Sequence, residues 1–487
     1  MVPKEWEIII DQFDGFVPGF WKNSLATFGN KSHASDMQHI DLTDPNVLTQ
    51  GPGLAALTNG TQAAEVSTLI KGMMKNSVDG TNCFGVGGNK LYKFTSTSVV
   101  DDANWAHTIT AASGTAAGED VAYYGGQYFY SYNYTGAGDV GRTNGTSTFD
   151  DNFMSTVPTD GAVLTAGVPH QMVVGGNDVL YIANGRYVAS YDGTTFVAHA
   201  LDLPAGEEVS SIAWDHNRLY ITSNRPDVST AVYTLGSIYL WDTFSTSWEY
   251  QITIPGKVGA SFSKNGLMYV WYQDMSSIGG YKIAYVTNNQ LKDINSYTGS
   301  LPNYYQVIDD QNHLLWLSSG EVWAWGAQTN DLSVKMFKYA EAGNNTTTGG
   351  ITNVFGTPMI ASHLTAGGLY QLAKFSGYDV NAQWKTIYFQ LASSISKARV
   401  TRVVVYTEPL ATGAKMDTTL NYDFGKSSVA LSQIAYSAAA NTTKHIIYRD
   451  GVEVENFSLA LSWANGSATN PVKVRAIHII GEFLDDN

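Results

Sequence analysis

One pattern recurs along most of this 487-residue chain: an apolar-aromatic pair in a short strand-like run, then a turn, then a second aromatic run. The pairs follow one another at an uneven interval of roughly 40 to 50 residues, the range of propeller repeats. They are Leu91-Tyr92, Tyr128-Phe129, Leu180-Tyr181, Leu219-Tyr220, Met268-Tyr269, Leu315-Trp316 and Leu369-Tyr370. One such unit is a small antiparallel sheet that cannot bury both faces alone, so neighbouring units must stack around a common axis. The repeat predicts an all-β fold with a six- or seven-bladed β-propeller.

The best-formed unit is DVLYIANGRYVASYDGTTF, which begins at Asp178. Leu180 and Ile182 alternate with Tyr181, and Asn184-Gly185 predicts a type I′ hairpin turn before the return strand. Ahead of the repeats, residues 61–76 have apolar side chains at helical spacing. That stretch is either one short helix or the opening strand of the ring.

The pattern changes after Trp384. Longer runs rich in β-branched residues follow, and Asp450-Gly451 predicts a hairpin turn between two of them. Several such strands in about a hundred residues indicate a two-layer antiparallel β-sandwich. We therefore expect three parts: an extended N-terminal arm over 1–60, the propeller over 61–384 and the sandwich over 385–487.

Charge and cysteine content narrow the function classes. The formal net charge is -15, so the chain lacks the basic surface that sequence-specific nucleic-acid binding requires. The single cysteine, Cys83, rules out an intrachain disulfide and is expected to be a small buried hydrophobe. The N-terminus turns polar at Asp11-Gln12, and no apolar run approaches the ~20 residues that cross a bilayer. We expect synthesis in the cytoplasm and no membrane insertion.

No catalytic motif is found in the sequence, and we expect no catalytic residue, no metal and no cofactor. The histidines show no metal-ligand spacing, and the Gly85-Val86-Gly87-Gly88 run lacks the helix and lysine of a phosphate loop. Carboxylates beside turn signals favour a role in backbone geometry over glycoside hydrolysis; these are Asp150, Asp151, Asp309 and Asp310, with Asp215 and Asp242 as further candidates. Aromatic rings on one hairpin suggest glycan stacking, although packing between blades is the favoured interpretation; they are Trp316, Trp323 and Trp325.

The N-terminal segment resembles the opening of tailed-phage tail and virion proteins. In those, a Gly-rich start leads to small polar residues, an Asp-Leu strand, a Pro-containing turn and a closing Pro-Gly. The matching positions are Gly15, Ala34, Ser35, Met37, Ile40, Asp41, Leu42, Pro45, Leu48, Pro52 and Gly53. Arm, propeller and sandwich in this order look like the tail nozzle or tubular proteins of short-tailed phages. One departure is Gln50-Gly51, where relatives often carry a basic residue before the Pro-Gly.

The resemblance implies a non-enzymatic structural component of a phage virion, assembled in the host cytoplasm and located in the tail. Its partners would be other tail proteins and further copies of itself, commonly six, in a ring around the DNA exit channel. An apolar arm with little local partner surface suits such a ring contact; its expected contact residues are Phe13, Phe16, Phe20, Trp21, Met37, Ile40 and Leu42. Two alternatives stay open: a carbohydrate-binding or glycosidase-like propeller, which would bind host surface glycans, and a capsid decoration protein.

Overall fold

The computed structural model describes residues 5–10, 34–41, 47–59, 62–63, 65–66, 68–75, 83–94, 106–159, 163–226, 233–274, 280–310, 313–326, 329–338, 348–354, 356–363, 370–390, 397–438, 442–464 and 466–484. By their contacts the residues form two compact units. Unit 1 comprises 1–54, 321–339 and 375–487, and unit 2 comprises 55–320 and 340–374. Within the described ranges the only α-helix is α2 (Phe153–Thr156).

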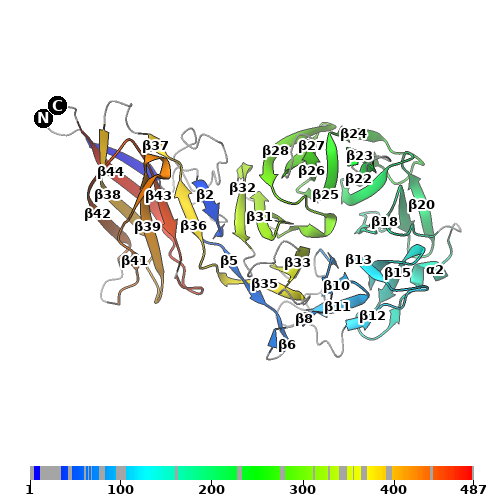
Figure 1. Ribbon diagram of the computed structural model, residues 1–487. Helices are drawn as coiled ribbons and strands as arrows, with labels where there is room; N and C mark the ends of the chain where they lie inside the picture. Colours follow the sequence, from blue (N-terminus) through cyan, green and yellow to red (C-terminus); the bar gives the residue numbers. More distant parts are fainter. Residues whose placement is uncertain are drawn as a thin grey trace. The chain divides into compact units, whose positions relative to one another are not determined.

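Seven small antiparallel sheets follow one another along the chain, and Figure 1 shows those of unit 2 arranged around an axis. The first three contain β9 (Gly72–Met73), β10 (Cys83–Gly87), β11 (Lys90–Phe94) and β12 (Ala106–Thr108); β13 (Ala117–Tyr124), β14 (Gln127–Tyr134), β15 (Ala137–Thr143) and β16 (Phe149–Asp150); and β17 (Met172–Val174), β18 (Leu180–Asn184), β19 (Tyr187–Tyr191) and β20 (Phe196–Asp202).

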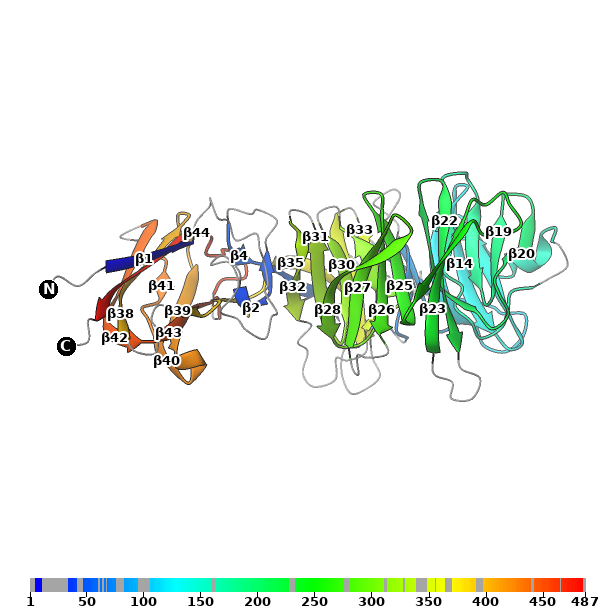
Figure 2. The same ribbon diagram turned by 90° about the horizontal axis from the view of Figure 1, so that it is seen from above.

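The next two sheets contain β21 (Glu208–Asp215), β22 (Arg218–Pro226), β23 (Tyr233–Trp241) and β24 (Tyr250–Ile254); and β25 (Gly256–Lys264), β26 (Leu267–Asp274), β27 (Gly280–Thr287) and β28 (Gln290–Thr298). Figure 2 shows β25 to β28 side by side. The sixth sheet has the order β29 (Val307–Asp309), β30 (Leu314–Ser318), β31 (Glu321–Gly326), β32 (Thr329–Lys338), and the 3₁₀ turn η1 (Tyr304–Gln306) precedes it.

The last sheet takes strands from both ends of the repeat region. It has the order β33 (Thr348–Val354), β34 (Thr357–His363), β35 (Tyr370–Tyr378), β5 (Pro52–Ala56), and β8 (Glu65–Val66) also pairs with β35. The Leu57 amide donates to the Leu372 carbonyl at 2.9 Å. The short pair β6 (Thr58–Asn59) and β7 (Gln62–Ala63) precedes β8. A strand from early in the chain thus closes the ring, and the predicted propeller is confirmed with seven sheets.

The stretch 61–76, for which helix and strand were both open, contributes β7, β8 and β9 where it is described, so the strand alternative holds. The apolar-aromatic pairs of the second to sixth sheets lie on the second strand, for example Leu180-Tyr181 on β18. Leu91-Tyr92 and Tyr370 instead lie on the third strands β11 and β35. The repeat therefore marks the sheets correctly but shifts by one strand at the two ends of the ring.

Two glycine-containing turns can be compared with their predictions. Asn184 pairs with Tyr187, so the two-residue loop is Gly185-Arg186 and not Asn184-Gly185. Only Gly185 has a positive φ, 62°, which indicates a type II′ turn in place of the predicted I′. The glycine run before Leu91 forms the end of β10 and the turn at Gly88, as expected of a strand connection.

Polar side chains join the inner strands of successive sheets. Between the second and third sheets, the Met172 amide donates to Asp120 Oδ2 at 2.8 Å. Between the third and fourth, the Gln171 side chain donates to the Ile212 carbonyl at 2.9 Å and accepts from the Ile212 amide at 2.8 Å. Each bond satisfies a backbone group at the inner edge of a sheet, which would otherwise be buried without a partner.

Polar bonds of several kinds join the later sheets of the propeller. The Asn224 side chain donates to the Val258 carbonyl at 2.8 Å and accepts from the Val258 amide at 2.7 Å, which joins the fourth and fifth sheets. Lys264 pairs with Asp309 between the fifth and sixth. The Gly350 amide donates to the Ile70 carbonyl at 3.0 Å, which joins the last sheet to the first.

Unit 1 contains the expected sandwich. One sheet has the order β1 (Glu5–Ile10), β44 (Val474–Leu484), β38 (Lys397–Thr407), β42 (Lys444–Val454). The other has the order β2 (Ala34–Gln38), β36 (Gln383–Thr386), β43 (Asn456–Ser462), β39 (Lys415–Tyr422), β40 (Ser427–Ala430), with β37 (Phe389–Gln390) on β43 and β41 (Ile434–Ala435) on β39. Trp6 of the first sheet stacks on Phe457 of the second at 5.7 Å between ring centroids. The pair β3 (Ile40–Asp41) and β4 (Thr49–Gln50) and the 3₁₀ turn η2 (Asp423–Gly425) complete the elements.

Two boundary predictions and one turn prediction need correction. The expected arm does not form a separate part where it is described: β1 and β2 are strands of the sandwich, paired with β44 and β36, and β5 belongs to the last propeller sheet. The expected propeller boundary at 384 lies beyond Lys374, the last residue of unit 2. Asp450-Gly451 is not a hairpin turn: β42 runs through it, with Gly451 at a φ of 57° beside a register shift against β38.

The bonds between inner strands generate a stability prediction. Gln171→Leu leaves both the amide and the carbonyl of Ile212 without their side-chain partner, so we expect a loss of about 2–4 kcal/mol in the free energy of unfolding. Gln290→Leu, on the exposed strand β28, should change it by less than about 0.5 kcal/mol. Urea titration followed by tryptophan fluorescence measures both, and equal effects of the two substitutions would contradict a structural role for the Gln171 bonds.

Candidate functional site

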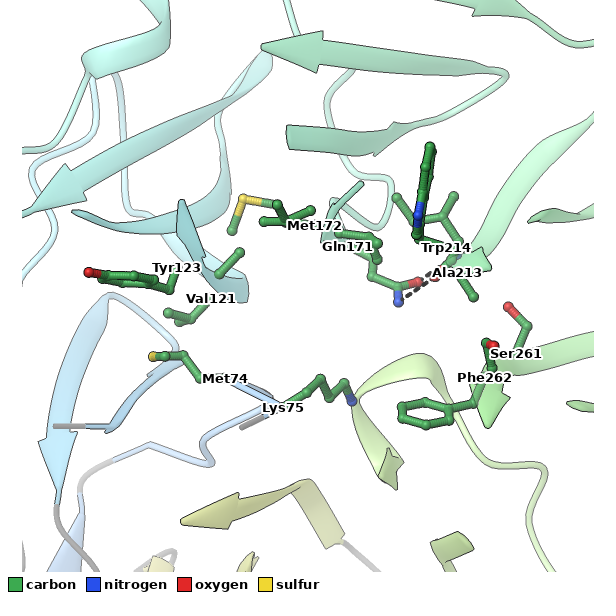
Figure 3. A pocket seen from close by; sticks show the side chains of 15 residues that line it. Met74, Lys75, Val121, Tyr123, Gln171, Met172, Ala213, Trp214, Ser261 and Phe262 are labelled. Atoms are coloured by element: carbon green, nitrogen blue, oxygen red, sulfur yellow. Dashed lines mark hydrogen bonds between the residues drawn. The ribbon is translucent and has the colours of Figure 1, made fainter. Parts of the chain in front are cut away.

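A cavity of about 430 Å³ lies where the first strands of the first five sheets converge. Five short segments of the chain line it, all of them in unit 2. They are 74–75, 121–123, 171–174, 212–214 and 261–263. Figure 3 shows their side chains around the open space. The cavity is a candidate ligand site, because pockets of this kind form where several elements converge.

Lys75 is hydrogen-bonded to η1 and to the first residue of β29. Lys75 Nζ donates to the carbonyls of Tyr304 at 2.7 Å and Val307 at 3.0 Å. The Tyr304 hydroxyl donates to the carbonyl of Glu119 at 3.1 Å and lies 3.2 Å from Glu119 Oε2. Tyr304 is buried, and this burial raises the pKa of its phenol well above the usual value. Lys75 thus connects the cavity wall to η1.

Burial shifts the ionisable groups behind the wall toward neutrality. It lowers the pKa of Lys75 to about 8, against the attraction of Asp120, which raises it. It raises the pKa of Asp120 to about 7, against the attraction of Lys75 and the hydrogen bond from Met172. The pKa of Glu119 is also raised by burial. Burial therefore disfavours the charged forms of both Lys75 and Asp120, while their mutual attraction opposes it.

The rest of the wall is mainly apolar. The rings of Tyr123, Trp214 and Phe262 are half-buried, and the indole of Trp214 stacks on Tyr181 with 5.8 Å between ring centroids. The cavity also meets the side chains of Met74 and Met172 (Figure 3). Such a wall favours a ligand with an apolar body.

The predicted arm contacts divide into two groups. Phe13, Phe16, Phe20, Trp21 and Leu42 lie outside the described residues. Met37 and Ile40 are 2% and 0% exposed. Met37 lies opposite Trp384 in the pairing of β2 with β36. The prediction that Met37 and Ile40 contact a neighbouring copy is therefore wrong, because their side chains are already buried in their own chain.

The three tryptophans considered for glycan contact are buried in the structure. Trp316 is fully buried, and its indole N–H donates to the Tyr281 hydroxyl at 2.7 Å. Trp323 and Trp325 are 6% and 5% exposed. None of the three offers a ring face to a sugar, so packing, the favoured interpretation, explains them.

Two of the carboxylates considered for catalysis, Asp151 and Asp242, accept hydrogen bonds from backbone amides. Asp151 accepts from the Thr110 amide at 2.8 Å and from Tyr130, and it lies 2.7 Å from His107 Nε2. Asp242 Oδ1 accepts from the Ser245 amide at 2.8 Å. Among the residues that the structure describes, no group of three or more His, Cys, Asp or Glu side chains is placed to hold a metal ion. No described helix is long and apolar enough to span a bilayer.

Sequence reasoning missed Lys75, Asp120 and Gln171. The Glu119-Asp120 pair inside an otherwise apolar strand, AGEDVAYY, is a signal that could have pointed to Asp120. Lys75 carries no such signal, because it lies in an irregular stretch after β9. Cys83 is buried as expected.

The raised pKa of Asp120 generates a pH prediction. Because the folded protein binds this proton more tightly than the unfolded chain, the carboxyl group's contribution falls as the pH rises from about 4 to about 7. The free energy of unfolding of Asp120→Asn, relative to the unsubstituted protein, should therefore increase from pH 5 to pH 8, with a slope of at most about 1.4 kcal/mol per pH unit. Denaturant titrations at several pH values measure it. Asp202→Asn, at an exposed ion pair 3.7 Å long, should show no such trend.

Solved structures similar to this chain match it with low TM-scores and little sequence identity. No protein-family model and no curated protein matches the chain. A chain in the crystal structure of the mitotic checkpoint complex matches with a TM-score of 0.41 and 11% identity, over 67% of this chain and 99% of that one. The N-terminal domain of Nup159 matches with a TM-score of 0.39 and 12% identity, over 73% and 100%. The exo-beta-1,3-galactanase of Phanerochaete chrysosporium matches with a TM-score of 0.33 and 12% identity, over 88% and 100%.

Proposed function

We propose that this protein is a non-enzymatic structural component of a tailed-phage virion, located in the tail, where several copies form a ring around the DNA exit channel. The observation that carries the proposal is the N-terminal segment, whose residues from Gly15 to Gly53 resemble the opening of tail and virion proteins. Its partners in this role are further copies of the chain and other tail proteins.

The construction of unit 2 supports a role as a rigid spacer. Successive sheets are joined by side-chain bonds to backbone groups, as at Gln171 and Asn224. Bonds of this kind hold the sheets in one arrangement, because opening them would leave buried polar groups without partners.

The axial region of the propeller is too narrow for DNA, so in this proposal the DNA channel lies between copies of the chain and not through one propeller. η1 is tied to Lys75 and Glu119, so its residues occupy the axial region beside the cavity. A cavity of about 430 Å³ accommodates a small molecule and not a DNA duplex. In this proposal the channel is enclosed by several copies of the chain, and the net charge of -15 keeps DNA from adhering to its wall.

Closed rings use head-to-tail interfaces, in which one surface of a copy meets a different surface of the next. We assign this contact to the aromatic residues of the N-terminal segment that lie outside the described ranges, namely Phe13, Phe16, Phe20 and Trp21.

Negative-stain imaging and light scattering of the purified chain test the proposal. We expect closed rings. The double substitution Phe16→Ser/Trp21→Ser should raise the dissociation constant of the ring by about tenfold or more, because aromatic anchors dominate interface energies. The melting temperature of the subunit should stay unchanged.

The control is Phe244→Ser. The Phe244 ring is 85% exposed in the turn after β23, and its removal should leave the rings intact. A chain that stays monomeric at tens of micromolar concentration, with or without its proposed tail partners, would refute the ring.

A further inference from the structure

We propose that the axial cavity of unit 2 binds a small organic acid, in which a carboxylate that meets Lys75 is carried on an apolar, ring-sized body. This site is independent of the proposed structural role. Its volume of about 430 Å³ falls within the usual range of small-ligand pockets.

The carboxylate is assigned from the hydrogen bonds of Lys75. An ammonium group has three N–H donors, and two of them go to the neutral carbonyls of Tyr304 and Val307. The third remains for a ligand, and Figure 3 shows the Lys75 side chain reaching into the space that the cavity occupies. Because carbonyls do not neutralise the charge, an anionic oxygen is the favoured third partner.

The charges around Lys75 leave room for this anion. Asp120 acts on Lys75 through space, and its own carboxyl group is engaged by the Met172 amide at 2.8 Å. Glu119 is attracted by Lys71 and is hydrogen-bonded by Asn133 and Tyr304. Burial raises the pKa of both carboxyl groups, which disfavours their charged forms.

The apolar body is assigned from the remaining wall. Tyr123, Trp214 and Phe262 bring aromatic rings from three different sheets to the cavity, and Met74 and Met172 bring flexible apolar side chains. Aromatic and methionine side chains together accommodate a flat ring.

A sugar fits this wall less well. Its hydroxyls need several free donors and acceptors, whereas two polar side chains of the wall, Gln171 and Ser261, are engaged in bonds between sheets. The Gln171 amide both donates to and accepts from Ile212. The Ser261 hydroxyl donates to Ser211 Oγ at 2.9 Å. The lining therefore favours an acid with an apolar body over a saccharide.

Three ligands with one indole body test the assignment by isothermal titration of the full chain at pH 7. They are indole-3-acetate, indole-3-acetamide and tryptamine, which carry a carboxylate, a neutral amide and an ammonium group. We expect the carboxylate to bind about tenfold or more tightly than the amide, and tryptamine to bind most weakly.

Two substitutions separate the charge from the cavity. Lys75→Met should bring the affinities for indole-3-acetate and indole-3-acetamide to within about twofold of each other. Lys90→Met, on β11 away from the cavity, should preserve the preference for indole-3-acetate. Ser263→Phe fills the cavity from its half-buried wall position and should abolish binding of all three ligands. Ser296→Phe, on exposed β28, should not.

Melting curves of each variant identify those that fold. Ser263→Phe retains Lys75 and its bonds to η1, so it tests the cavity without removing the charge. Equal affinity of the unsubstituted protein for the three ligands would overturn the proposal. So would a preference for the carboxylate that survives Lys75→Met, tighter binding of galactose than of indole-3-acetate, or no heat from indole-3-acetate up to millimolar concentration.

Discussion

The propeller depends on how the exposed backbone edge of each sheet is satisfied at the centre of the ring. A small sheet presents a row of unpaired N–H and C=O groups along its first strand, and burying that row costs free energy. Here the carboxylate of Asp120 and the amides of Gln171 and Asn224 bond to backbone groups of the next sheet. At these three joints, hydrogen bonds as well as apolar packing hold one sheet against the next.

The same central bonds explain why the axial space is a small cavity. Residues that reach across to a neighbouring sheet narrow the axis, and η1 fills part of it through Tyr304. Fixing Tyr304 requires buried donors and acceptors, which is why Lys75, Glu119 and Asp120 are present in a largely apolar surrounding. The low polarity shifts the pKa values of these groups toward neutrality, because burial penalises the charged forms.

Local sequence patterns predicted the sheets but not the connections between distant segments. Alternation of apolar and aromatic residues located the strands around Leu180 and Leu219. It could do so because successive side chains of a strand point to opposite faces, so the two faces can be read from the local sequence. The turn at Gly185-Arg186 was misplaced by one residue because Asn-Gly is a common turn pair, whereas here Asn184 bonds to the Ala198 carbonyl and the Thr165 amide. The pairing of β1 with β44 joins the two ends of the chain and has no local signal. The tryptophans, likewise, could be placed inside or outside only once the neighbouring strands were known.

Ligand binding in the axial cavity and the rigidity of the propeller are coupled, because the same residues serve both. Gln171 lines the cavity and also joins two sheets, and Lys75 lines it and holds η1. A ligand that binds only the folded protein raises its stability by mass action, in proportion to the logarithm of the ligand concentration over its dissociation constant. Because five sheets contribute residues to the cavity wall, that stabilisation would act on the propeller as a whole and not on one sheet. An acid bound at Lys75 would therefore strengthen the scaffold on which the proposed structural role relies, while leaving the surfaces available for contact with other copies unchanged.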